Sequence, residues 1–212
     1  MTGAPTGPRA TRASRSAPRR GRPSSGARER ILEAAIEVLK AEGYAGLTIA
    51  KVATAAGESK PLVPYHYGSK QGLVKACGRE VAEMITAAAL DAVGGATKVE
   101  EVIEGAAAGV ERVLDRDDRV ARLYFDLAAV SVVDPEIRKT ITEVNEQWRV
   151  VLTRLLSEAS DGPSPARARV LTVMVIAGIQ GLTLERIERG ATPELRRARE
   201  LFVRGAVAAA SG

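Results

Sequence analysis

Three observations predict an all-α fold for this chain of 212 residues. From Arg28 onward, apolar residues recur at helical spacing in almost every segment. Glycine, proline and small polar residues stand at intervals that suit helix ends. No segment shows the period-two alternation of a half-buried β-strand. An apolar fraction of 45% is enough to build a substantial helical core.

Four helices are expected ahead of a hinge at Gly94-Gly95. Thr48, Ser59 and Ser69 are suitable N-cap residues, because their hydroxyl groups can accept a hydrogen bond from a free backbone N–H. Gly57 is able to end the second helix in the left-handed conformation. The four helices are predicted to cover about 28–41, 48–56, 59–67 and 69–93.

Five more helices are expected after the hinge. Pro135 and Pro193 suit the first turn of a helix, where proline loses no intrahelical hydrogen bond. These helices are predicted to cover about 99–115, 118–132, 135–159, 164–189 and 193–209.

Composition favours a soluble protein of the cytoplasm. Cys77 is the only cysteine, so no disulfide can form within the chain. The first 30 residues lack the apolar stretch of a signal peptide. The longest apolar region, Val170 to Leu184, contains polar residues and is shorter than the roughly 20 residues of a membrane span. We therefore expect no membrane partner.

The net charge of +5 is concentrated at the N-terminus. Residues 1–30 hold eight arginines and one glutamate, so the rest of the chain is slightly acidic. Residues 1–27 are predicted to form a disordered, Arg-rich tail, because they are too polar to build a core. Such a tail can follow a phosphate backbone or enter a minor groove, and it can equally be a solvated leader.

The segment from Thr48 to Lys70 indicates a helix-turn-helix. Ala53 is small enough for the next helix to pack closely, and Gly57 allows the turn that sends the chain across it. The following helix is expected to expose side chains that can meet phosphates, thymine methyl groups and base edges. They are Lys60, Leu62, Tyr65 and His66. Lys70, at the start of the fourth helix, is a further candidate for phosphate contact.

Residues 28–75 resemble the DNA-binding domain of the TetR (tetracycline-repressor) family. Two motifs carry the resemblance: Leu47-Thr48-x-x-x-Val52-Ala53-x-x-Ala56-Gly57-x-Ser59 and Tyr65-His66-Tyr67-Gly68-Ser69-Lys70-x-x-Leu73. The resemblance implies a homodimeric regulator that binds a palindromic operator and releases it on binding a small molecule. It favours a repressor over an activator. It implies no cofactor. Residues 76–212 would then be the effector-binding and dimerisation domain. The predicted DNA-binding residues are Arg28, Thr48, Ser59, Lys60, Leu62, Pro64, Tyr65, His66 and Lys70.

Two residues depart from the family pattern. Glu58 replaces a small apolar residue, which a solvent-facing turn would tolerate. Pro64 stands where the family often has an aromatic residue. It removes a backbone hydrogen bond to Lys60 and disfavours α geometry at Val63, so we expect a bent or 3₁₀-like recognition helix.

The last two helices are predicted to form the dimer interface. Two apolar stripes on different faces of 164–189 require that helix to be covered twice. The final helix repeats small and apolar residues at spacings of 3 and 4, as a coiled-coil seam does. Packing within one subunit is the alternative. The predicted interface residues are Val170, Met174, Ala177, Gly181, Leu184, Leu195, Ala198, Phe202 and Gly205.

A ligand pocket is predicted among the middle helices. With only 3% aromatic residues, the aromatic side chains there are conspicuous, and the amides at 145 and 180 could anchor a bound molecule. Ordinary core packing is the alternative. The candidates are Met84, Tyr124, Phe125, Leu127, Asn145, Trp148, Leu152 and Gln180.

The sequence offers little for catalysis. His66 is the only histidine and lies in the basic reading segment, and together with Cys77 it cannot complete a Cys/His zinc centre. There is no Gly-rich phosphate-binding loop. Two alternatives remain: a helical protein-interaction module that does not bind DNA, and a helical enzyme that uses carboxylates alone.

Overall fold

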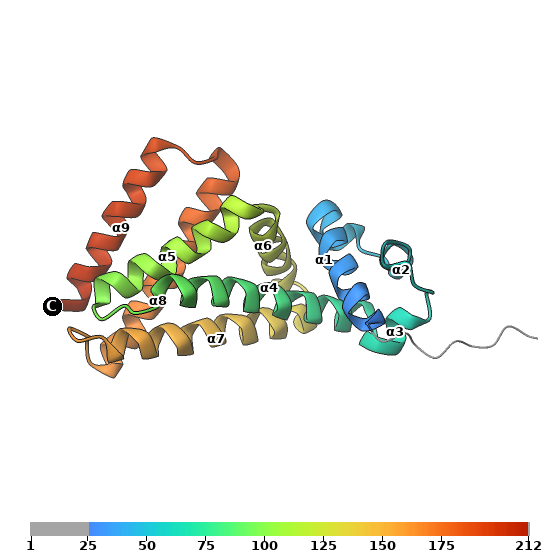
Figure 1. The fold of residues 1–212 in the computed structure, drawn as a ribbon, viewed down its shortest axis with the longest axis horizontal. Helices are drawn as coiled ribbons and strands as arrows, with labels where there is room; N and C mark the ends of the chain where they lie inside the picture. The colour runs from blue at the N-terminus through green and yellow to red at the C-terminus, as the bar shows by residue number, and fades with distance from the viewer. Residues whose placement is uncertain (1–25, 212) are drawn as a thin grey trace, which may run out of the picture.

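A computed structural model describes residues 26–211 of the chain, and every regular element within that range is an α-helix (Figure 1). The predicted all-α fold is therefore confirmed. The helices are α1 (Ala27–Gly46), α2 (Ile49–Ala56), α3 (Leu62–Tyr67), α4 (Lys70–Val93), α5 (Val99–Arg116), α6 (Arg119–Ser131), α7 (Pro135–Glu158), α8 (Pro165–Arg189) and α9 (Pro193–Ser211).

The helix ends follow from local chemistry. The Thr48 hydroxyl accepts a hydrogen bond from the backbone N–H of Lys51 at 3.2 Å, and the Ser69 hydroxyl accepts one from Gly72 at 3.0 Å. Gly57 ends α2 in the left-handed region, with φ of 65°. These predicted caps and the predicted stop are confirmed.

Three predicted details of the N-terminal helices are wrong or need adjustment. Ser59 does not cap α3, which follows Pro61, and only the Ser59 carbonyl takes part, accepting from the Leu62 N–H. Gly43, with φ of 68°, interrupts α1, so the regular helix stops close to the predicted end. The tail was expected to include residue 27, but Ala27 is buried at the start of α1. Residues 1–25 of the predicted tail lie outside the described residues.

The predicted domain boundary at residue 75 falls within an unbroken helix. Figure 1 shows α1, α2 and α3 at one end of the molecule, with α4 leading from them toward α8 and α9. One core cluster joins α1–α4 to α5–α7 through Val113, Leu127 and Ile137. A second cluster lies among α5, α7, α8, α9 and the last residue of α4, Val93. The N-terminal helices are thus packed directly on the C-terminal bundle.

Helix α8 has the length and composition of a membrane span, which the estimate from Val170 to Leu184 missed. It has 25 residues. Its most apolar window has a mean hydropathy of 1.5, and 22% of that window is buried inside the protein. Its buried and exposed apolar residues lie on different faces: Leu171 and Val175 are in the core, whereas Val170 is 71% exposed. The exposed face is the one predicted to meet a second subunit.

Candidate DNA-reading surface and ligand cavity

Helices α2 and α3 form the predicted helix-turn-helix. Val52, Ala53 and Val63 are almost fully buried and fix the two helices on the N-terminal core. The backbone N–H of Glu58 donates to the Ala53 carbonyl at 2.9 Å, across the left-handed Gly57. The small side chain of Ala53 and the conformation of Gly57 therefore produce the close turn, as the sequence indicates.

The effect of Pro64 is confined to the first turn of the recognition helix. The Val63 N–H donates to the Lys60 carbonyl at 3.3 Å, an i→i−3 bond of 3₁₀ type. From Tyr65 onward the bonds are α-helical, with the Tyr65 N–H donating to the Pro61 carbonyl at 3.2 Å. Val63 remains within the α-helix. The first backbone N–H groups of any helix have no acceptor within that helix, so a proline in the first turn of α3 removes no intrahelical hydrogen bond. Helix α3 is therefore short but not broken.

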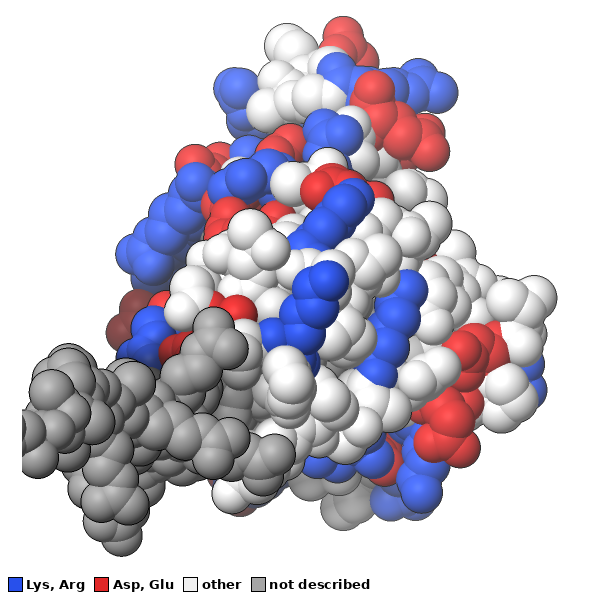
Figure 2. Space-filling view, turned by 90° about the vertical axis from the view of Figure 1, so that its right-hand side faces the viewer, with Lys and Arg blue, Asp and Glu red and all other residues white. Residues whose placement is uncertain are grey.

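Several predicted reading residues share an exposed surface at this end of the molecule. Tyr65 is 70% exposed, which is unusual for a large aromatic side chain in a folded domain. Lys60 is exposed and pairs with no other described residue. Figure 2 looks onto this end and shows separate Lys and Arg side chains on a largely uncharged surface. The other exposed candidates are Arg28, Thr48, Ser59 and Pro64.

Three predicted DNA contacts are placed differently by the structure. Leu62 is partly buried against the core. The Nε2 atom of His66 is buried without a hydrogen-bond partner, and its ring packs edge-on against Tyr65 at 5.0 Å between centroids. Lys70 points back to α1, where its Nζ donates to the Tyr44 carbonyl at 3.1 Å and lies 4.4 Å from the Tyr44 ring centroid. Contact of these three side chains with DNA stays a prediction.

Helix α1 holds the turn and the recognition helix in place. Glu58 is only 11% exposed and pairs with Arg30, 2.6 Å from Nη2, so the expectation of a solvent-facing Glu58 is wrong. The Tyr67 hydroxyl donates to the Arg28 carbonyl at 2.7 Å, and the Arg28 guanidinium lies over the Tyr67 ring. Tyr67 thus packs against the core with its polar end satisfied at the surface.

The middle helices enclose an apolar cavity of ≈ 120 Å³, here called the aromatic cavity. Five of the predicted ligand-binding residues lie in its wall: Tyr124, Phe125, Trp148, Leu152 and Gln180. The described residues of the wall include no charged side chain. The sequence prediction missed further members, among them Ile85, Thr86, Val110, Val151, Leu155, Ile179 and Thr183. The helical spacing of Val151 and Leu155 from Trp148 is a signal that could have identified them.

Hydrogen bonds order the few polar groups of this wall. Gln180 Nε2 donates to the Tyr124 hydroxyl at 2.8 Å, which in turn donates to Asn145 Oδ1 at 2.8 Å. The indole N–H of Trp148 donates to the Thr86 hydroxyl at 2.8 Å. Burial raises the pKa of Tyr124, and the Asn145 contact only partly opposes this, so the phenol is neutral at physiological pH. The aromatic rings are therefore held in fixed orientations.

Three predicted ligand-binding residues lie outside the cavity wall. Met84 is exposed, because it lies on the opposite face of α4. Leu127 is fully buried in the core that joins the two ends of the molecule. Asn145 supports the Tyr124 hydroxyl from behind. Rarity in the sequence identified polar and aromatic residues, but only the packing of α6 and α7 decides which faces point inward.

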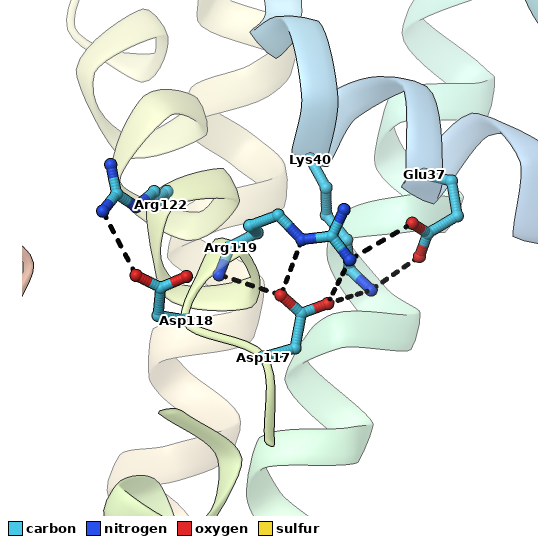
Figure 3. A network of polar contacts seen from close by, with 6 residues as sticks. All are labelled: Glu37, Lys40, Asp117, Asp118, Arg119 and Arg122. Atoms are coloured by element: carbon cyan, nitrogen blue, oxygen red, sulfur yellow. Dashed lines mark hydrogen bonds and ion pairs between the residues drawn. The ribbon is translucent and has the colours of Figure 1, made fainter. Parts of the chain in front are cut away.

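A polar network connects helix α1 to the start of α6, close to the cavity helices (Figure 3). Lys40 is only 9% exposed, and its Nζ lies 2.8 Å from Glu37 and 3.2 Å from Asp117. Arg119 meets the Asp117 carboxylate with two nitrogens, at 2.8 and 2.9 Å. Hydrogen bonds from Arg119 and Lys40 hold the pKa of Asp117 far below its usual range, despite burial. Burial lowers the pKa of Lys40, but its hydrogen bonds to Glu37 and Asp117 outweigh this and raise it.

A second contact lies at the break in α1. The Asp126 carboxylate of α6 accepts a hydrogen bond from the Tyr44 N–H at 2.6 Å, directly after the left-handed Gly43. Asp126 follows Tyr124 and Phe125, which line the cavity. One short helix therefore touches both the cavity and the DNA-reading end. Nothing in the sequence pattern identified this junction.

The predicted dimer residues divide into two groups. Val170, Met174 and Leu184 of α8 are exposed, as are the small residues Ala177, Gly181, Ala198 and Gly205. Leu195 and Phe202 are partly buried in the subunit, with Phe202 against Gly178. This edge of the α9 seam packs toward α8 within the subunit, and a role of the two residues in the interface stays a prediction. The exposed Val173 and Leu201 belong to the outer face and were missed.

The helix-turn-helix at one end and the apolar cavity in the bundle define a ligand-responsive DNA-binding transcription regulator. Family models agree with this class. The family described as bacterial regulatory proteins, tetR family, matches residues 31–77, and the BetI-type transcriptional repressor C-terminal family matches residues 102–209, half of the chain. The chain belongs to the TetR family of bacterial transcription regulators, as the resemblance indicated.

Individual relatives show the same relationship. The HTH-type transcriptional regulator CymR of Pseudomonas putida is 27% identical over 186 residues, which cover 82% of this chain and 90% of CymR. The HTH-type transcriptional regulatory protein RaaS of Mycobacterium tuberculosis is 51% identical, but over only 59 residues, 28% of this chain and 27% of RaaS.

Solved structures agree in fold. A transcriptional regulator of Streptomyces coelicolor A3(2) has a TM-score of 0.70 at 26% identity and covers 88% of this chain and 99% of its own. FadR of Bacillus subtilis, solved with stearoyl-CoA, has a TM-score of 0.69 at 17% identity and covers 85% and 98%. At that identity the second likeness shows the fold alone.

Proposed function

We propose that this regulator binds a palindromic operator as a homodimer through α2 and α3, and releases it when a small molecule enters the aromatic cavity. The observation that carries the DNA-binding part is the exposed surface formed by Lys60, in the turn before α3, and Tyr65, on α3, which Val63 anchors in the core. A cation and an exposed aromatic ring at a recognition helix suit phosphate contact and base-edge contact.

Fluorescence anisotropy with the DNA upstream of the protein's own gene tests the reading surface. Lys60→Gln is expected to weaken operator binding and to reduce the slope of log affinity against log salt by about 1, because one phosphate contact is lost. Lys139→Gln, on the exposed face of α7, removes the same charge outside the helix-turn-helix and is the matched control. Equal losses in both variants, or binding that does not depend on salt, would contradict the assignment.

The ligand is proposed to act through α6. This helix carries Tyr124 and Phe125 in the cavity wall and Asp126 against the Tyr44 N–H. A ligand that moves the aromatic pair must also move the carboxylate, since a helix shifts as a unit. The relatives support a ligand-responsive mode: EbrR is described as a multidrug binding protein and FadR was solved with stearoyl-CoA.

Asp126→Asn tests this transmission, because it keeps the shape of the side chain and removes its charge. We expect operator affinity without ligand to change by less than about threefold and ligand-induced release to lose most of its coupling, typically about 1–3 kcal/mol. Glu146→Gln, exposed on α7, is the control. Unchanged release in Asp126→Asn would exclude the charge of Asp126 as a requirement for the route, since the asparagine oxygen can still accept from the Tyr44 N–H.

The homodimer is proposed to form on the outer face of α8 and α9. Val170 and Leu201 are 71% and 55% exposed, and with Val173 they form an apolar surface that water would otherwise cover. Gly181 and Gly205 have open space where a Cβ would stand. Glycines with no packing role inside the subunit suit a close approach of helices from a second subunit.

The proposal includes no catalytic step and a cytoplasmic location. Burial raises the pKa of the Cys77 thiol to about 12, so the single cysteine is a poor nucleophile. Among residues 26–211, no cluster of metal-ligating side chains occurs. The unreactive thiol supports a regulator that acts by binding alone.

A further inference from the structure

The aromatic cavity adjoins a second hollow with a different chemical character. This hollow, here called the arginine hollow, has a volume of ≈ 380 Å³ and lies between α5, α8 and α9. Val110, Ile179 and Thr183 line both the hollow and the aromatic cavity. The two spaces therefore lie on either side of the same three side chains.

Three arginines surround the arginine hollow: Arg186 from α8, and Arg196 and Arg199 from α9. Two carboxylates from α5, Glu111 and Asp115, also reach it, so the formal charge of its lining is +1. Arg196 has no ion-pair partner among the described residues. At least one guanidinium is thus available to a bound anion without breaking an existing pair.

The two paired arginines are less exposed to solvent than their carboxylate partners. Arg186 is 21% exposed, whereas its partner Asp115 is 67% exposed. Arg199 Nε lies 3.3 Å from Glu111 but outside hydrogen-bonding geometry, so its buried N–H has no acceptor. A buried guanidinium N–H without an acceptor is costly, and an oxygen of a bound anion would satisfy it.

We propose that the effector is an amphipathic organic carboxylate whose apolar part occupies the aromatic cavity and whose carboxylate binds Arg196 and Arg199 in the arginine hollow. Planar guanidinium groups suit carboxylate oxygens, because they offer parallel N–H donors and keep their charge. The uncharged wall around Trp148 suits the other end of the molecule. This inference rests on the proposed role of the aromatic cavity and adds the charge and shape of its ligand.

Three probes of the same length test the proposal: 4-phenylbutanoate, 4-phenylbutanamide and 4-phenylbutylamine. Binding to the full chain is measured by calorimetry and by the fluorescence of Trp148, the only tryptophan. We expect the carboxylate to bind at least about tenfold more tightly than the amide, because a charge-assisted hydrogen bond is worth at least that factor, and the amine to bind most weakly.

Charge-neutralising variants locate the anion site. Arg196→Gln is expected to reduce affinity for 4-phenylbutanoate by about tenfold and to leave the amide unchanged. Arg196 has no ion pair to lose, so folding is not at risk. Arg199→Gln is expected to act in the same direction. Arg189→Gln, whose arginine pairs with Glu185 away from the hollow, is the control and should leave both affinities unchanged.

The outcomes separate this inference from the proposed function. If the amide binds wild type as tightly as the carboxylate, or if Arg196→Gln and Arg189→Gln behave alike, the anion site is refuted and the apolar ligand site remains. If none of the three probes binds, the inference is refuted, whereas the role of the aromatic cavity, which requires no carboxylate, is not. Operator binding, measured separately by anisotropy, does not depend on either result.

Discussion

Two glycines of the last helix pair allow subunit packing and dimer packing to be tested separately. Apart from its chain neighbours and the nearby backbone of α9, Gly205 has no atom within 4 Å of the position of an added Cβ, whereas at Gly178 that position is 2.2 Å from the Phe202 ring. Gly205→Leu is therefore expected to leave the subunit fold intact and to overpack the interface with a partner. Overpacking costs about 1–3 kcal/mol at each site, and twofold symmetry introduces the leucine twice. Even about 2 kcal/mol raises the dimer dissociation constant about 30-fold.

Equilibrium sedimentation gives the dissociation constant, and far-UV circular dichroism checks that the helices remain. Gly178→Ala is the contrasting variant: it should lower the free energy of unfolding by about 1–2 kcal/mol, since the ring of Phe202 must move, with the better helix propensity of alanine offsetting part of the cost. A Gly205→Leu protein that dimerises as tightly as wild type would refute the outer face of α9 as the interface.

Three other predictions concern stability and reactivity. Lys40→Met should lower the free energy of unfolding by about 1–2 kcal/mol, as charge-assisted bonds to Asp117 are lost. The pKa of Asp117 is lowered and that of Lys40 is raised, so this stabilisation is complete above the usual carboxyl pKa of 3.8 and below the usual lysine pKa of 10.5. In urea titrations, Lys40→Met should therefore lose a constant free energy of unfolding from about pH 5 to 9, and the difference from wild type should shrink outside this range. Cys77 in the folded protein should react with a thiol reagent at pH 8 at least about 100-fold more slowly than free cysteine, and at the normal rate in urea. Gly109→Ala should cost about 1–3 kcal/mol in urea denaturation, because its Cβ would lie 2.4 Å from the Ala89 Cα and force α4 and α5 apart.

The helices and their ends were predictable because they depend on neighbours in the sequence. A cap such as Thr48 or a stop such as Gly57 acts within three or four residues, and the structure places both as expected. Ser59 failed because Pro61, two residues later, suits the first turn without a side-chain cap. A sequence shows both candidate helix starts, but no simple rule says which of the two residues begins the helix.

The direction in which side chains point was less predictable, because it depends on contacts with residues far away in the sequence. Lys70 is of a residue type that binds phosphate, yet its ammonium group contacts the ring and the backbone carbonyl of Tyr44. Glu58 was expected in solvent, and Arg30 draws it into a half-buried pair. In each case a charged residue suits the protein surface, but a contact with a residue more than 25 positions away in the sequence decides where the side chain points.

The same limit explains why the junction between α1 and α6 could not be foreseen. Asp126 and Asp117 look like ordinary solvated acids in the sequence, since neither belongs to a motif. Their significance comes from the left-handed break at Gly43, which leaves the Tyr44 N–H in need of an acceptor just where α6 passes. The same helix supplies this acceptor on one face and cavity-lining rings on another, which is why we propose that a ligand acts on α1 through α6. On that proposal, the link between the cavity and the DNA-reading end depends on how an interrupted helix satisfies its backbone.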